Sequence, residues 1–151
     1  MSTGMTIKQH IDHWVSSSDE SIKDMQASIK SKRRLNAVYS GHQSVEKIMK
    51  ALLAAQDVRV LFTHDLVKLS KLSGLELNDE QLDELHTINA FYIAAKYHGK
   101  KSEIYKRCTP KYTHVWTGKM RQWHKAIKRE VLEIRKEVPN RTMASFPSDT
   151  Y

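Results

Sequence analysis

The segment that decides the predicted fold is Val38-Tyr-Ser-Gly-His-Gln-Ser-Val-Glu-Lys-Ile-Met-Lys-Ala-Leu-Leu-Ala-Ala55. Its apolar residues recur at helical spacing, at Val38, Val45, Met49 and Leu52. This spacing predicts a helix that buries one face. Period-two runs of β-branched residues are absent, and all three prolines follow residue 109. The sequence therefore predicts an all-α protein.

The same periodicity extends this helix to residues 32–56 and predicts further helices at 6–29, 66–73, 78 to about 99, and 116–138. The serines near residue 17 leave a break in the first helix open, but the apolar stripe keeps its phase and favours a continuous helix. Thr63 is the predicted N-cap of the short helix, and Asn78 with Gln81 forms a capping-box pattern. A long connection is expected between about residues 96 and 112.

The length of 151 residues fits a single domain with one core. We expect a helical bundle over residues 1–138 and a flexible tail over residues 139–151. No apolar run approaches the roughly 18 residues that a membrane span needs. With one cysteine and no secretion signal at the N-terminus, a cytoplasmic location is expected.

Charge is unevenly distributed along the chain, whose formal net charge is +8. Residues 76–84 carry five acidic side chains and no Lys or Arg, whereas residues 30–34 and 96–111 are basic. The fold is therefore expected to have an acidic flank and at least one basic flank. Both could be ordinary solvated faces, or the basic one could attract a polyanion such as nucleic acid.

Five short motifs, in this order, resemble those of the HEPN domain family (higher eukaryotes and prokaryotes nucleotide-binding). They are Ile11-Asp-His-Trp-Val-Ser-Ser-Ser-Asp19, Gly41-His-Gln-Ser-Val-Glu-Lys-Ile-Met-Lys-Ala-Leu52, Thr63-His-Asp-Leu-Val-Lys-Leu69, Leu75-Glu-Leu-Asn-Asp-Glu-Gln81 and Tyr105-Lys-Arg-Cys-Thr109. The second motif is the most specific. The chain departs from the family at Ala95-Lys96-Tyr97-His98-Gly99, where Ala-Arg-Tyr-Pro-Asp is usual.

The resemblance implies an up-and-down bundle of four or five helices that is usually a homodimer. Many members of the family are encoded beside a small nucleotidyltransferase and form a two-gene, toxin–antitoxin-like system with it. Some members are metal-independent endoribonucleases that use an Arg-x4–6-His motif. Others serve as nucleotide- or RNA-binding and regulatory modules, which is the function that we expect for this chain, with the endoribonuclease as the alternative.

Two residue pairs fit the ribonuclease spacing, namely Arg59 with His64 and Arg107 with His114. An imidazole can move the proton of a 2′-hydroxyl, and an arginine can hold phosphate or the developing charge. However, the chain holds eight histidines and many basic residues, so this spacing carries little information by itself. Both pairs could equally be surface or capping residues.

A second group of polar residues lies beside the apolar stripe of the 38–55 helix. It contains Tyr39, His42, Gln43, Glu46 and Lys50. If this group is a nucleotide-binding site, Lys50 would meet a phosphate and Tyr39 would stack on a base. Lys96, from the motif that differs from the family's, would be a further binding residue. As structure alone, the group would be a polar seam between helices whose hydrogen bonds are satisfied internally.

No metal site or cofactor is expected. His10 and His13 share a helical face, but no third ligand is evident, so a surface pair is favoured. The expected partners are a second copy of the chain, a nucleotidyltransferase, and a nucleotide or RNA, without a membrane.

Overall fold

The computed structural model describes residues 4–98 and 103–143. The described residues form helices and connecting segments, and the one β-type pairing among them is an isolated bridge between Thr6 and Thr142. The elements are α1 (Ile7–Lys30), α2 (Arg34–Ala55), α3 (Leu66–Leu72), α4 (Asp79–Ile93), the π-helical turn η1 (Ala94–His98), α5 (Glu103–Arg107) and α6 (Pro110–Lys136). The all-α prediction is confirmed.

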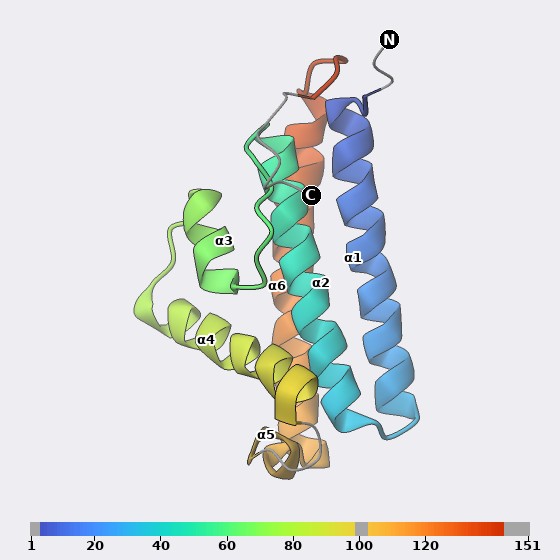
Figure 1. Cartoon of the computed structure of the whole chain (residues 1–151), viewed down its shortest axis with the longest axis vertical. Coiled ribbons are helices and arrows are strands. Elements are labelled where there is room, and N and C mark those ends of the chain that lie inside the picture. Colours follow the sequence, from blue (N-terminus) through green and yellow to red (C-terminus); the bar gives the residue numbers. More distant parts are fainter. Residues whose placement is uncertain (1–3, 99–102, 144–151) are drawn as a thin grey trace.

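Three long helices, α1, α2 and α6, run alongside one another, while α3 and α4 pack at one side of α2 (Figure 1). The central helix α2 contacts α1, α3, α4 and α6. Because it has neighbours all around, α2 buries charged and polar side chains as well as its apolar stripe. The sequence pattern indicated one buried face, and the structure buries more than that.

α1 is continuous through its serines, as the phase of its apolar stripe predicted. Thr6 caps the helix in a capping box with Gln9. Ser18 turns inward and donates its hydroxyl to the backbone carbonyl of Ser44 on α2, at 2.9 Å. Its hydroxyl thus finds a partner across the helix interface, so the serines do not break the helix.

Gly41 marks the closest approach of α2 to its neighbours. A Cβ atom built at this position would overlap Sδ of Met120 on α6 and lie 3.2 Å from Sδ of Met25 on α1. The absence of a side chain therefore lets three helices meet here, at the level of the polar residues described below.

The start of α3 differs from the prediction. Its N-cap is Asp65, whose carboxylate accepts hydrogen bonds from the amides of Val67 and Lys68. Thr63 instead accepts a hydrogen bond from the Asp65 amide and shapes the approach to the helix. The capping box of Asn78 with Gln81 at the start of α4 is confirmed. Gly74 adopts a φ of 75° just after α3, a conformation that glycine reaches without strain.

The region after α4 is more helical than expected. α4 passes into η1, α5 occupies part of the predicted connection, and α6 begins at Pro110 rather than near residue 116. Thr109 caps α6, and the proline stands in the first turn, where its missing amide costs nothing. Residues 99–102, including Gly99 of the departing motif, lie outside the described residues.

The chain after α6 returns to the start of α1. The Ile7 amide donates to the carbonyl of Arg141, and the Met143 amide donates to the carbonyl of Met5. The Arg141 guanidinium also pairs with Asp57 at 2.9 Å. Part of the segment predicted as a flexible tail is thus hydrogen-bonded, and residues 144–151 lie outside the described residues. In the described part of the chain, no helix is long and apolar enough to cross a membrane.

Candidate functional site

A buried carboxylate organises the polar residues of α2. Glu46 accepts a hydrogen bond from the Lys50 ammonium at 2.9 Å through Oε2, and its Oε1 lies 2.8 Å from Nδ1 of His64. The Lys50 side chain is 0% exposed, and its Nζ lies 5.4 Å from the ring centre of Trp14 on α1. Burial lowers the pKa of Lys50, and the Glu46 carboxylate opposes that shift by favouring the charged ammonium.

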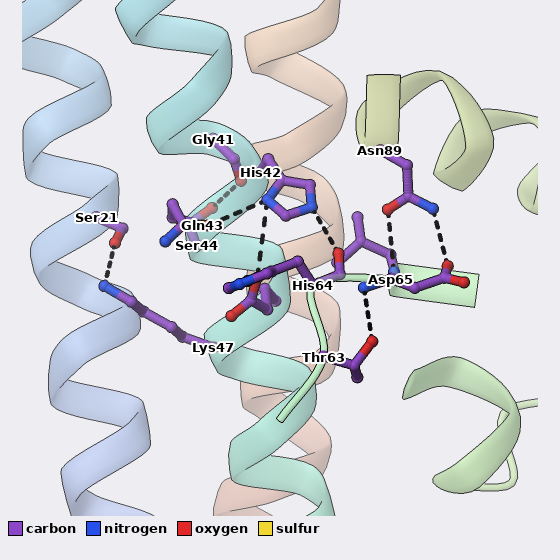
Figure 2. A network of polar contacts seen from close by, with 12 residues as sticks. Ser21, Gly41, His42, Gln43, Ser44, Lys47, Thr63, His64, Asp65 and Asn89 are labelled. Carbon is purple, nitrogen blue, oxygen red and sulfur yellow. Dashed lines mark hydrogen bonds and ion pairs between the residues drawn. The ribbon is translucent and has the colours of Figure 1, made fainter. Parts of the chain in front are cut away.

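His64 reaches this carboxylate from the segment between α2 and α3, and Figure 2 shows its backbone carbonyl hydrogen-bonded to the His42 ring. Since a carboxylate can only accept, Nδ1 of His64 carries the proton that it donates to Glu46. Nε2 makes no hydrogen bond with any described residue, and whenever the ring is neutral this nitrogen holds a lone pair. With 37% of the side chain exposed, His64 presents a fixed, oriented acceptor to solvent.

His42 fixes the backbone that carries His64. Its Nε2 lies 3.0 Å from the carbonyl oxygen of His64, and its Nδ1 lies 3.2 Å from the side-chain amide of Gln43. Burial lowers the pKa of His42 and favours the neutral ring, which has a single N–H. Both contacts are with acceptor oxygens, the His64 carbonyl and Oε1 of Gln43, so that single N–H can serve only one of them at a time.

Four rings form a continuous surface next to this network, and we call Tyr39, Phe62, His64 and Tyr92 the aromatic face. The Tyr92 ring on α4 stacks on His64 at 4.5 Å between centroids and on Tyr39 at 5.8 Å. Phe62 meets the His64 ring edge-on at 5.8 Å and is 68% exposed. His42 lies behind them, 5.0 Å from Tyr92. The face therefore combines flat rings with the acceptor on His64.

The structure brings together five of the six predicted nucleotide-binding residues and changes the role of one. Tyr39, His42, Gln43 and Glu46 all belong to the network or its aromatic cover. Lys50 is too deeply buried to meet a phosphate, and its ammonium neutralises Glu46 instead. The sixth, Lys96, is exposed on η1.

The two Arg–His pairs are placed very differently. His64 lies in the network, whereas Arg59 is partly buried in the segment that follows α2. Arg107, at the end of α5, hydrogen-bonds to the Tyr112 side chain, and His114 is exposed on α6. No hydrogen bond joins either arginine to its histidine among the described residues. Of these four residues, His64 alone joins the nucleotide-binding candidates.

The sequence interpretation missed Tyr92, Phe62 and the pair Asp65–Asn89. On α4, Phe91 takes the buried position, and the neighbouring Tyr92 turns to His64. Asn89 donates to the Asp65 carboxylate at 2.9 Å and accepts from the Leu66 amide at 3.0 Å (Figure 2). It thereby ties α4 to the segment that carries His64. Phe62 could have been predicted as a site residue, because it directly precedes the Thr63-His64 motif in the sequence.

The predicted histidine pair on α1 contacts Trp14. The indole N–H donates to Nε2 of His10 at 3.0 Å, and the His13 ring meets the indole edge-on. Burial, followed by the nearby charge of His13, lowers the pKa of His10 and favours its role as acceptor. Within residues 4–98 and 103–143, no three His, Cys, Asp or Glu side chains gather as metal ligands.

Comparison with known proteins identifies the family. The model of the HEPN domain matches residues 11–138, which cover most of the chain and all of its long helices except the first turn of α1. No curated protein and no solved structure matched the chain. The matched region includes the whole of the aromatic face and the network behind it. The chain belongs to the HEPN domain family.

Proposed function

We propose that the chain is a nucleotide- or RNA-binding module and that the aromatic face is its binding surface. The observation that carries this proposal is the ring series Tyr39–Tyr92–His64–Phe62, stacked or edge-on and open to solvent at Phe62. Bases bind to such rings because every base has a flat π-face. Family membership supports a nucleotide- or RNA-related role.

His64 adds polarity to the stack. Its Nε2 lone pair can accept a hydrogen bond from an exocyclic amine of a base or from a ribose 2′-hydroxyl. Glu46 holds the ring in that orientation, and Lys50 cancels the negative charge that would otherwise repel a phosphate. The buried ion pair thus supports the binding surface from behind without touching the ligand.

Electrostatic attraction comes from the rest of the chain. With a net charge of +8, the protein attracts polyanions, and Lys96 lies exposed just four residues beyond Tyr92. Phosphates need no pocket of their own under these conditions, because several mobile lysines and arginines can neutralise them. We therefore expect RNA affinity to fall as salt is raised.

The direct test is RNA binding measured by fluorescence anisotropy with a labelled single-stranded oligonucleotide. Replacing Phe62 with Ala removes a stacking ring and should weaken binding roughly five- to hundredfold, because one base–aromatic stack contributes about 1–3 kcal/mol. Leu132→Ala is the matched control, since Leu132 is an exposed apolar residue on α6 with 41% exposure. Equal affinity of Phe62→Ala and wild type, or no binding of RNA and of mononucleotides by wild type, would reject the proposal.

A second candidate function is a metal-independent endoribonuclease. The specific observation in its favour is the Glu46–His64 pair, in which a carboxylate orients an imidazole whose second nitrogen is open to act as a base. RNA incubated with the protein in EDTA should then be cleaved, and His64→Ala should abolish cleavage while His114→Ala retains it. Intact RNA with wild type leaves the binding module as the function.

We further propose that the chain acts as a homodimer and with a small nucleotidyltransferase as the second component of a two-gene system. Both partners rest on family membership. Light scattering on the purified chain tests the dimer. Co-purification with the product of an adjoining nucleotidyltransferase gene tests the second partner, and the lack of such a gene would remove its basis.

A further inference from the structure

A second surface, away from the aromatic face, is hollowed into a groove of about 630 Å³. It lies between α6 on one side and the α3–α4 loop with the first turns of α4 on the other. We define this acidic groove by its apolar floor of Leu75, Leu77, Trp123 and Ile127 and by its rim of Glu76, Glu80, Glu84 and Glu130. No residue of the aromatic face lines it, so nothing said above assigns it a role.

The floor contains an aromatic ring held in a fixed orientation. The Trp123 indole N–H donates to Oε1 of Glu84 at 3.0 Å, and the Lys119 ammonium holds the other carboxylate oxygen at 3.1 Å. Large aromatic side chains that are held in place and flanked by aliphatic ones are typical of the centre of a protein interface. The groove therefore offers a preformed binding site for an apolar side chain.

The rim carries negative charge that the described fold does not neutralise. Glu76, Glu80 and Glu130 make no ion pair or hydrogen bond with any described residue. The helix dipole accounts for Glu80 in the first turn of α4. It does not account for Glu76, which precedes the helix, or for Glu130, which lies two turns from the end of α6. This charge is a local reversal on a chain of net charge +8.

We propose that the acidic groove docks a basic amphipathic segment of a partner protein. Its floor matches the apolar side chains that such a helix presents at i, i+3 and i+4, and its rim matches flanking Lys and Arg. The field of the uncompensated carboxylates favours a cationic partner and repels phosphate. The groove thus selects against the RNA proposed for the aromatic face, and the two surfaces take partners of opposite charge.

The test uses a labelled synthetic peptide of about four helical turns, with Leu at i, i+3, i+4 and i+7 and Lys elsewhere. It should bind the wild-type chain and change the tryptophan fluorescence, and Trp123→Phe should remove that change. The double variant Glu80→Lys, Glu130→Lys should weaken binding by at least about tenfold. The matched control is Glu133→Lys, Glu137→Lys, which changes the net charge equally at the C-terminal end of α6, outside the groove.

Three outcomes would overturn the proposal. One is equal loss of binding in both double variants, which means general charge attraction. Another is equal binding of an all-Lys peptide, which means that the apolar floor plays no part. The third is a wild-type dimer that the groove variant alone dissociates, with no peptide binding, because the groove is then filled by a second copy. If the Lys variant fails to fold by circular dichroism, Glu80→Gln with Glu130→Gln replaces it.

Discussion

The aromatic face and the acidic groove both include residues of α4, but their glutamates differ in burial and in ion pairing. Glu46, behind the aromatic face, is buried and bonded by Lys50 and His64. Glu80 and Glu130, on the groove, are exposed and make no ion pair with any described residue. A carboxylate whose charge is cancelled within the fold can only position its neighbours. One whose charge is left uncancelled acts on whatever approaches from outside.

This difference also explains how a surface next to a carboxylate can accept an anion. Without Lys50, the negative charge of Glu46 would lie directly behind His64 and repel phosphate. With Lys50 in place, the aromatic face has an oriented imidazole and no net negative charge at its back. The groove lacks such a counter-ion for most of its rim, and so we assign it a cationic partner.

The largest expected effect follows from breaking the buried ion pair. Lys50→Ala leaves Glu46 as an unpaired buried charge and should lower the free energy of unfolding by about 3–5 kcal/mol, measured by urea denaturation. Glu80→Ala on the groove should change it by no more than about 0.5 kcal/mol. The double variant Glu46→Leu, Lys50→Met should recover most of the loss. Similar stabilities of Lys50→Ala and Glu80→Ala would contradict the comparison.

Acid should lower the free energy of unfolding of the chain, and part of that loss should come from His42. Burial lowers the pKa of His42 in the folded chain, so the unfolded chain binds a proton more readily. Stability is therefore fully present above the unfolded pKa of 6.5 and is lost as pH falls from there toward the lower folded pKa. The slope contributed by His42 should approach about 1.4 kcal/mol per pH unit.

The measurement compares urea denaturation of wild type and His42→Gln between about pH 7.5 and about pH 5.5. His10 and His124 also have lowered pKa values through burial, and they remain in both proteins. The variant should accordingly lose less stability on acidification than wild type. Parallel curves for the two proteins would show that His42 does not carry the effect.

A smaller effect separates the two surfaces through Asn89. Asn89→Ala removes one hydrogen bond to Asp65 and one from the Leu66 amide, and should cost about 1–2 kcal/mol. Because these bonds fix the segment that carries His64, RNA affinity should fall while binding of the basic peptide to the groove stays the same. Thr87→Ala, at a half-buried residue two positions earlier in α4, is the control. Equal weakening of both ligands would mean that Asn89 merely stabilises α4.

Much of the fold could be predicted because its signals are local. The start of α1, the continuity of that helix and the capping box at Asn78 depend on residues within one or two turns of each other. The N-cap of α3 was misplaced because Thr63 and Asp65 are both residue types that cap helices well. They lie only two positions apart, and the sequence pattern does not distinguish them. α5 and the first two turns of α6 were missed, since α5 is too short for periodicity to register and the apolar stripe of α6 begins only at Trp116.

The sequence predicted which residues form the candidate site better than it predicted what each of them does. Helical spacing grouped Tyr39, His42, Glu46 and Lys50, which the structure brings together. It could not reveal that α2 has neighbours on every side, and this is what buries Lys50 and turns a predicted ligand contact into a counter-ion. The acidic stretch at residues 76–84 was evident, but the groove also needs Glu130 and Trp123 from a helix far along the chain.

The pairing of residues 5–7 with residues 141–143 has one more consequence. It brings the start of α1 and the end of α6 to the same pole of the bundle (Figure 1). Dyes attached at Met5 and Met143 would therefore transfer energy efficiently in the closed bundle and lose that signal when the two helices part. Such a reporter would follow the separation of the start of α1 from the end of α6.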